Sequence, residues 1–428
     1  MRHLPLGIVV LALCSLPSTG CRKAPEEVER PEKIQSIREV TYDSATYVKL
    51  AGLWEKYYDA YPSEDAYANS MYAAFNAHVG YAEAMIAKGV QKYPANPVLL
   101  YLSARSKDWG PHNLEGRQLL IKATTLDPDY MEPWFSLAAQ YIVQGDRENG
   151  DVALRHLLTG GAIDDMVMDF NYNMIASLDT NAILITNGDN DTYPGWILTR
   201  IIRFRPDVLI VNRSLLNLRD YAAAVVKDGV PPFVTAAELD SLMNQKSAWV
   251  ANDKRGEEPD GWWMTVGDRL VERIINACDR LHRPVYLACT VENYGLWKER
   301  EGHATNLGLV TLVTSSTISP GEHVRRLLNT WATHYRTGGL DSWQLHASRP
   351  ASASRALVPS YAAALRTLMP GITAAGADEQ IALFRWYRSH VMDLIDRNFV
   401  DKANSMWFGP NRPKEIADWS RSKGWTGD

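Results

Sequence analysis

The sequence lacks the residue patterns that mark the common classes of metal, nucleotide and nucleic-acid proteins. It has four cysteines and 10 histidines, and no Cys/His cluster has the ligand spacing of a zinc site. The net charge is −5 and no long run of Lys or Arg occurs, so bulk binding of nucleic acid is excluded, because phosphate affinity needs clustered cations. There is no G-x-S-x-G, Walker or G-x-G-x-x-G motif, and a serine hydrolase, an NTPase or a dinucleotide enzyme therefore has no support.

Long apolar runs are also missing, apart from one at the amino terminus. A short basic start is followed by an apolar core, Leu6–Leu16, which is too short to span a bilayer, and then by small residues that lead into Cys21. This pattern resembles the lipobox of bacterial lipoproteins, in which the cysteine is lipidated and becomes the mature amino terminus, although Ser18 stands where leucine is usual. An ordinary secretory signal is the alternative. In both cases residues 1–20 are expected to be a signal peptide and the mature chain is expected to be exported.

A lipid on Cys21 would hold the chain on a membrane of the Gram-negative cell envelope, facing the periplasm, and the outer membrane is favoured over the inner. Residues 21–42 are charged and contain two prolines, which suits a tether. Two further cysteines, Cys278 and Cys289, are expected to be free thiols, although an oxidising periplasm would permit a disulfide. No other stretch approaches the length of a membrane span.

Residues 43–160 have a helical pattern that repeats. Prolines at positions 62, 94 and 128 close helices at intervals of 32 and 34 residues, and a period of 34 is typical of the tetratricopeptide repeat, a pair of antiparallel helices. The best match to a first helix is Trp134-x-x-Leu137-Ala138-x-x-Tyr141. The pattern predicts stacked tetratricopeptide-like repeats that bind a protein partner, and an unrelated helical bundle is the alternative.

The stretch 179–320 changes to an α/β pattern. Asn181–Asn217 reads NAILITNGDNDTYPGWILTRIIRFRPDVLIVNRSLLN, which is an apolar strand, a polar turn, a helix and a second strand. Thr235–Val250 reads as a helix with a capping threonine, and Pro284–Val291 and Leu307–Val313 read as further strands. Strands that alternate with helices favour a Rossmann-like, mainly parallel sheet covered on both faces. Residues 321–428 read as a C-terminal helical region, so the predicted fold class is all-α repeats followed by an α/β domain and more helices.

Polar side chains follow the predicted strands at the points where they end. They are Asn187, Asp189, Asn190, Asp191 and Thr192 after the first strand, Asn212 and Ser214 after the second, and Thr290, Glu292 and Asn293 after the third. The carboxyl ends of parallel strands share one edge of a sheet, so these groups are expected to converge on a ligand site. Asp189 and Asp191 could hold a divalent cation through oxygen ligands, and with Glu292 they are the candidate catalytic residues. The alternative for N-G-D-N-D-T is a turn and helix cap whose side chains bond their own backbone.

The Asn181–Asn217 segment and the later PVYLACTVEN resemble the soluble carboxyl-terminal region of bacterial protein O-mannosyltransferase-like membrane proteins, common in Bacteroidetes. In that family tetratricopeptide-like helices accompany a strand with a TNGDNDT-type turn. Two features depart from the family: the multi-span membrane domain is missing, and Gly195-Trp196 replaces aromatic or leucine side chains after the proline of the turn. The resemblance therefore implies an envelope module that recognises an acceptor protein or glycan, and it does not imply transferase activity.

Together these patterns predict an exported, lipid-anchored interaction scaffold with an α/β ligand-binding module, acting in envelope glycan or protein assembly. The alternative is a metal-dependent enzyme of sugar or phosphoryl chemistry that uses Asp189 and Asp191, with Asn212 and Glu292 as helpers and a divalent cation as cofactor.

Overall fold

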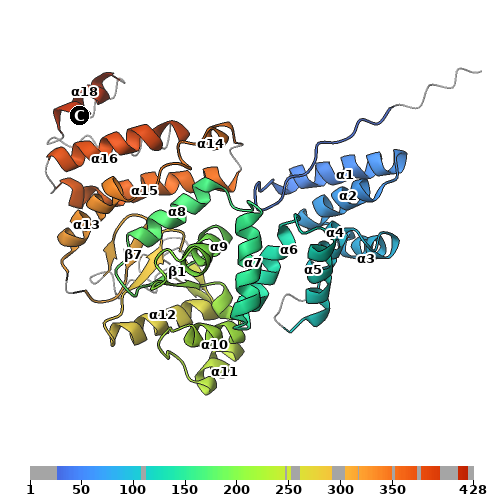
Figure 1. The fold of residues 1–428 in the computed structure, drawn as a ribbon, viewed down its shortest axis with the longest axis horizontal. Coiled ribbons are helices and arrows are strands. Elements are labelled where there is room, and N and C mark those ends of the chain that lie inside the picture. The colour runs from blue at the N-terminus through green and yellow to red at the C-terminus, as the bar shows by residue number, and fades with distance from the viewer. Residues whose placement is uncertain are drawn as a thin grey trace, which may run out of the picture.

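The computed structural model describes residues 27–107, 112–245, 248–251, 261–291, 304–316, 318–348, 352–373, 377–395 and 413–422. In the order of the chain these residues form a helical array, an α/β unit with a small sheet, and a group of C-terminal helices. In Figure 1 the C-terminal helices lie above the sheet and the array lies to its right. Most of the described secondary structure is helical. The expected signal peptide, residues 1–20, and the lipidation site Cys21 lie outside the described residues.

The array consists of antiparallel helices that each pack on the next one. They are α1 (Ser44–Ala60), α2 (Glu64–Asn76), α3 (Ala82–Lys92), α4 (Pro97–Arg105), α5 (Leu114–Leu126), α6 (Glu132–Val143) and α7 (Arg147–Thr159). Three prolines lie in the turns before α2, α4 and α6: Pro62, Pro94 and Pro128. Each stops the preceding helix, because proline has no backbone N–H and its ring clashes with the preceding turn. This arrangement fits tetratricopeptide-like repeats.

Small residues allow the helices of the array to approach closely. Gly89 on α3 faces α2, and a Cβ atom added to it would lie 2.5 Å from the Cε1 atom of Tyr67. Gly116 and Ala123 on α5 are buried in the same way. The amino ends of α4 and α5 are capped by asparagine side chains, since Asn96 accepts from the amide of Leu99 at 3.0 Å and the Asn113 side chain caps α5.

The stretch expected to be a tether is described from residue 27 onward, and there it packs along the array. The indole of Trp54 donates to the carbonyl of Glu32 at 3.2 Å, and the amide of Ile37 donates to the Tyr72 hydroxyl at 2.9 Å. Ile34 is buried. Residues 27–42 thus bond to Trp54 of α1 and Tyr72 of α2, contacts that a composition rich in charged residues does not reveal.

The sheet is mixed. Its strands are β1 (Ile183–Thr186), β2 (Leu209–Asn212), β5 (Val285–Ala288), β6 (Thr305–Asn306) and β7 (Val310–Leu312), in the order β2-β1-β5-β7-β6. β1 lies between β2 and β5 and is parallel to both, whereas β7 is antiparallel to β5 and to β6. The expectation of a mainly parallel sheet is therefore correct only for the first three strands.

The predicted fourth strand, Leu307–Val313, is wrong in its first half, which is the turn of a hairpin. Gly308 has φ +84°, and its amide donates to the Asn306 side chain at 2.8 Å, an arrangement that turns the chain back on itself. A hairpin needs no crossover helix, so β7 can pair antiparallel with β5.

The parallel strands are joined by helices on both sides of the sheet. α9 (Asp189–Trp196) connects β1 to β2 and continues into a π-helical turn, Ile197–Ile201. α10 (Arg219–Lys227) and α12 (Val266–Asp279) lie between β2 and β5 in the chain. Figure 1 shows α12 passing below the strands and α8 (Asp165–Ala176) above them.

The segment after α10 differs from the predicted single helix Thr235–Val250. Its first part is α11 (Ala236–Gln245), and the Thr235 hydroxyl accepts from the amide of Glu238 at 3.3 Å, as a capping threonine does. Its last part, however, is strand β3 (Ala248–Ala251), which pairs antiparallel with β4 (Gly261–Met264). An apolar run of four residues fits a strand or a helix equally well, and here the hydrogen bonds with β4 stabilise the strand.

The C-terminal region is helical, as predicted. Its helices are α13 (Pro320–Thr333), α14 (Trp343–Ala347), α15 (Ala353–Thr373), α16 (Ala377–His390) and α18 (Lys414–Ser422). α15 packs on α8, α13 and α16. The last described residues, 413–422, contain α18. Across the described residues, no helix has the length and apolar character needed to cross a membrane.

Candidate functional site

The turn after β1 is built around a buried carboxylate. Asp191, in the first turn of α9, is 1% exposed and accepts from the amides of Asn187 and Gly188, each at 2.8 Å. Its other partner is the hydroxyl of Thr290, which follows β5. Burial raises the pKa of Asp191, and the bonds from these donors lower it in part. Asp191 therefore caps α9 and ties the end of β1 to the end of β5.

A proline inside α9 leaves a carbonyl that the helix cannot satisfy. Pro194 has no N–H, so it cannot donate to the carbonyl of Asn190 four residues earlier. The side-chain amide of Asn171 on α8 donates to that carbonyl at 2.7 Å, and Asn171 is fully buried. α8 thus supplies the missing donor, which fixes α9 and the polar turn that precedes it.

The ends of β1 and β2 are joined by a second set of hydrogen bonds. The Asn212 side chain donates to the Thr192 hydroxyl at 2.8 Å, and the hydroxyls of Thr192 and Thr186 lie 2.7 Å apart. The Ser214 hydroxyl donates to the carbonyl of Asn187 at 3.0 Å. Asn212, Thr192 and Thr186 are all buried. These predicted site residues do converge, and most of their hydrogen-bonding capacity is used among themselves.

Arg213 extends this network to α12, a link that sequence reasoning missed. Its guanidinium donates to the Asn187 side chain at 3.1 Å and pairs with the buried carboxylate of Asp268. Asp268 also accepts from the amide and hydroxyl of Thr265, at 2.7 and 2.8 Å, so it caps α12. The T-x-x-D pattern before the apolar positions of α12 was the available signal.

Asp189, in contrast, points out of the network and has a partner from a distant part of the chain. Its carboxylate, 55% exposed, pairs with the guanidinium of Arg38, which precedes α1. That guanidinium lies 4.6 Å from the ring centre of Phe135 on α6 and 5.8 Å from that of Tyr193 on α9. Arg38 thus joins the N-terminal segment, the array and the α/β unit. Nothing in the sequence identified it, because it lies within the stretch that reads as a tether.

A cavity of about 400 Å³ opens beside this contact, between the strand ends and the array. Its lining combines Asn187, Gly188, Asn212 and Ser214 from the strand ends with residues of α4 and α6. The array residues are Arg105, Ser136 and Ala139. Arg38 and Asp189 also line this cavity, which we call the strand-tip cavity.

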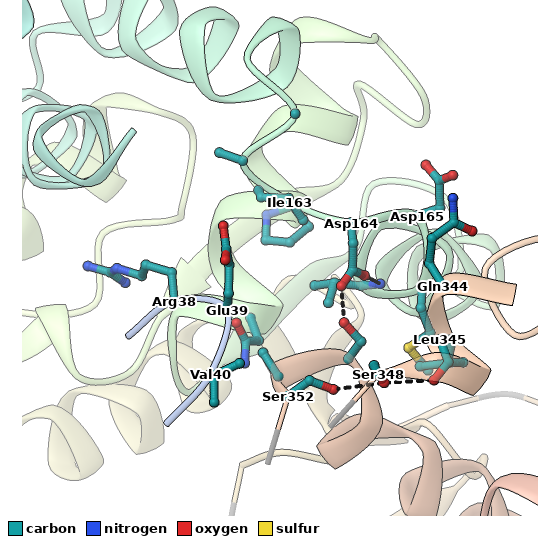
Figure 2. A pocket seen from close by; sticks show the side chains of 18 of the residues that line it. Arg38, Glu39, Val40, Ile163, Asp164, Asp165, Gln344, Leu345, Ser348 and Ser352 are labelled. Atoms are coloured by element: carbon teal, nitrogen blue, oxygen red, sulfur yellow. Dashed lines mark hydrogen bonds between the residues drawn. The ribbon is translucent and has the colours of Figure 1, made fainter. Parts of the chain in front are cut away.

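A second cavity, of about 780 Å³, lies on the other side of the same ion pair. Arg38 and Asp189 line it together with the N-terminal segment, the first turn of α8, α14 and the start of α15. Figure 2 shows Glu39 and Asp164 around this space, with Asp165 and Gln344 at one end. Burial raises the pKa of both Glu39 and Asp164. The larger cavity thus carries the carboxylates of Glu39, Asp164 and Asp165 beside several amides and hydroxyls, and the Arg38–Asp189 pair lines both cavities.

Not all of the predicted site residues can be placed. Asn190 lines the larger cavity, and Thr290 is held by Asp191. Glu292 and Asn293 lie outside the described residues. Within the part of the chain that is described, no group of three or more His, Cys, Asp or Glu residues could hold a metal ion. Cys278 is buried and Cys289 is exposed, and both are free thiols.

Comparison with known proteins gives one match. Residues 167–228 match the model of a family described as TMEM260-associated domain 2. The matched stretch includes most of α8, all of β1, α9, β2 and α10, and therefore the whole strand-end turn. No curated protein and no solved structure matches the chain. The family match covers Asn181–Asn217, the first of the two segments that resemble the O-mannosyltransferase-like proteins, and agrees with that resemblance only loosely.

Proposed function

We propose that this chain is an exported, lipid-anchored protein of the Gram-negative cell envelope that acts as a binding scaffold, with a ligand held between its helical array and its α/β unit. The observation that carries the proposal is the strand-tip cavity, because residues from both of these parts of the chain line it. A ligand in it contacts both parts at once. We describe β2, β1 and β5 as a reduced Rossmann-like unit, since the cavity lies at the carboxyl ends of its parallel strands, where such sheets bind ligands.

The chemistry of the cavity fits a polar ligand without a strong charge. Its lining includes the amides of Asn187 and Asn212 and the hydroxyl of Ser214, which already bond within the network and keep part of their capacity for a ligand. Arg38, Arg105 and Asp189 add charges of both signs. Sugar hydroxyls both donate and accept hydrogen bonds, so they can bond to amide, hydroxyl, guanidinium and carboxylate groups. The N–H and C=O groups of a peptide backbone can do the same. The resemblance to O-mannosyltransferase-like proteins supports a glycan or an acceptor protein segment as the ligand.

The contacts of the two aspartates favour binding over metal-dependent catalysis. Asp191 accepts from two amides and a hydroxyl, and Asp189 is neutralised by Arg38. Carboxylates with these partners maintain the structure of the site. In the enzyme alternative, both carboxylates would have to break these bonds in order to coordinate a cation.

The test is calorimetry on the mature chain carrying Cys21→Ser, with mannose-containing oligosaccharides and Ser/Thr-rich peptides as probes. Arg105→Ala should weaken binding of the probe at least tenfold, because Arg105 lines the cavity and belongs to the array. Arg155→Ala is the matched control, an exposed arginine of α7 that does not line the cavity. Equal loss in both variants, or no binding of either class of probe, contradicts the proposal.

The same titration with Mg²⁺, Mn²⁺ and Ca²⁺, with and without nucleotide sugars, addresses the enzyme alternative. Heat of cation binding that disappears in Asp189→Ala would replace the scaffold proposal with a metal-dependent enzyme. The anchor is tested separately: Cys21→Ser should release the chain from membranes, and a variant that still sediments with them contradicts lipidation.

The array is the part assigned to a protein partner. Leu114, Ile121 and Leu126 of α5 are large apolar side chains that are exposed, between 42% and 65%. Ile121→Asp should therefore weaken co-purification of an envelope protein and leave calorimetric binding of the small probes unchanged. If Ile121→Asp still co-purifies with the partner, the exposed apolar residues of α5 do not bind it.

A further inference from the structure

A short turn of the N-terminal segment carries Arg38 into the space between the two cavities. The amides of Glu39 and Val40 donate to the carbonyl of Ser36 at 2.9 and 3.0 Å, and the amide of Arg38 donates to the Ser36 hydroxyl at 3.1 Å. We call Ser36–Val40 the Arg38 turn. It is closed by local bonds, so its shape does not depend on the Arg38 side chain.

The Arg38 turn is held at both ends by contacts that do not involve Arg38. Before it, Ile34 is buried in the hydrophobic core, and the amide of Ile37 donates to the Tyr72 hydroxyl of α2. After it, Val40 is buried and forms a β-bridge with Ser352, and the amide of Ala353 donates to the carbonyl of Glu39 at 3.0 Å. The turn therefore stays in place when the guanidinium moves, and only the side chain has to swing.

The contacts of the guanidinium are those of a reversible closure. Its ion pair is with Asp189; the Arg38 side chain is 19% exposed and that of Asp189 is 55% exposed, and a pair that water reaches on one side is weaker than a fully buried one. Its other contacts are the faces of Phe135 and Tyr193, which do not fix one hydrogen-bonding geometry. A long, flexible side chain held in this way can leave without unfolding its surroundings.

We propose that Arg38 is a latch: its side chain closes the strand-tip cavity from the side of the larger cavity, and its release from Asp189 joins the two. Both residues line both cavities, so the pair lies where the two spaces adjoin. The joined space takes an extended ligand, longer than a single sugar or amino-acid residue. The inference deepens the proposed binding function and rests on it for its biological meaning, but access to the cavity can be measured without any ligand.

The experiment measures access with a thiol placed inside the strand-tip cavity. The mature chain carries Cys21→Ser and Cys289→Ser, and Ser136→Cys supplies the reporter, since Ser136 lines the cavity and is 7% exposed. Cys278, which is fully buried in the sheet region, stays as an internal reference for global unfolding. Labelling by N-ethylmaleimide at each thiol is followed by mass spectrometry.

Arg38→Ala should raise the labelling rate at position 136 about tenfold and leave that of Cys278 unchanged. Arg38→Lys, which keeps the charge but not the planar group, should raise it by less. Arg30→Ala is the matched control, because Arg30 precedes the turn and pairs with Asp65 at 2.7 Å where both side chains are largely exposed. It should leave both rates unchanged.

Three results would overturn the latch. The rate at position 136 could be the same with and without Arg38, or it could rise together with that of Cys278, which would make Arg38 a structural support. Arg30→Ala could also act as strongly as Arg38→Ala, which would assign the closure to the whole segment. Failure of the oligosaccharide and peptide titrations would not affect these rates, so the proposed function and the latch fail separately.

Discussion

The two aspartates of the strand-end turn should contribute very differently to stability, although they stand two positions apart. Asp191→Ala removes the acceptor for the amides of Asn187 and Gly188 and for the Thr290 hydroxyl. Each buried donor left unsatisfied costs about 1–3 kcal/mol, and these amides are only partly buried, so the lower half of that range applies. Relief of the buried charge offsets a part. We expect a net loss of about 2–3 kcal/mol in the free energy of unfolding.

Asp189→Ala removes a single ion pair whose partners are 19% and 55% exposed, and such pairs contribute at most about 1 kcal/mol. The cation–π contact of Arg38 with Phe135 remains in this variant. The expected difference between the two variants is therefore about 2 kcal/mol, with Asp191→Ala the less stable.

Urea unfolding followed by tryptophan fluorescence measures this difference, provided that the slope of the transition is the same in both variants. Thr290→Val should lie between them, because it removes one donor to Asp191 and leaves both amide bonds. Equal stability of the two alanine variants, or a greater loss for Asp189→Ala, would refute the assignment of Asp191 as the structural centre of the turn.

Two further predictions concern the array and the first βαβ unit. Gly52→Ala should stabilise the chain by about 0.5–1 kcal/mol in urea unfolding, because Gly52 lies inside α1 and no atom lies within 4 Å of the added Cβ. Gly89→Ala should instead destabilise it by about 1 kcal/mol net, because the new Cβ meets the ring of Tyr67. The reverse order of stability would contradict the close packing of α2 on α3. Hydrogen bonds from Arg205 lower the pKa of Asp207 to about 2, below its value in the unfolded chain, so the stability that Asp207 contributes is present above about pH 4 and is lost as the pH falls toward 2. Asp207→Asn should accordingly be less destabilising at pH 2.5 than at pH 6, because Asp207 is then partly protonated in the folded chain and mostly protonated in the unfolded one, and an effect that does not shrink with falling pH would contradict this pairing.

Patterns within a few residues were readable from the sequence because they depend on local geometry. The prolines at intervals of 32 and 34 residues mark the ends of array helices, and the T-x-x-D pattern that begins at Thr265 is the cap of α12. The polar turn after β1 was also located correctly. Its extent was not, because N-G-D-N-D-T already contains the first turn of α9, with Pro194 inside the helix.

The internal proline shows why the boundary of α9 could not be predicted. A proline normally argues against a helix that runs through it, because a carbonyl loses its donor. Here the donor comes from Asn171, which belongs to a different helix. Equally, an apolar run near residue 250 becomes a strand only because β4 is available to pair with it.

The sequence alone determined the order of helical array, α/β unit and C-terminal helices, and which polar groups follow the strands, since periodicity and strand ends are properties of neighbouring residues. Tertiary structure decided what those groups do. Asp191 meets Thr290 across 99 residues, and Asp189 meets an arginine from before the first helix. The cavities exist only because three distant parts of the chain enclose them. A carboxylate looks the same in the sequence whether it binds a ligand or its own backbone, and only the groups that the fold brings within hydrogen-bonding distance distinguish the two.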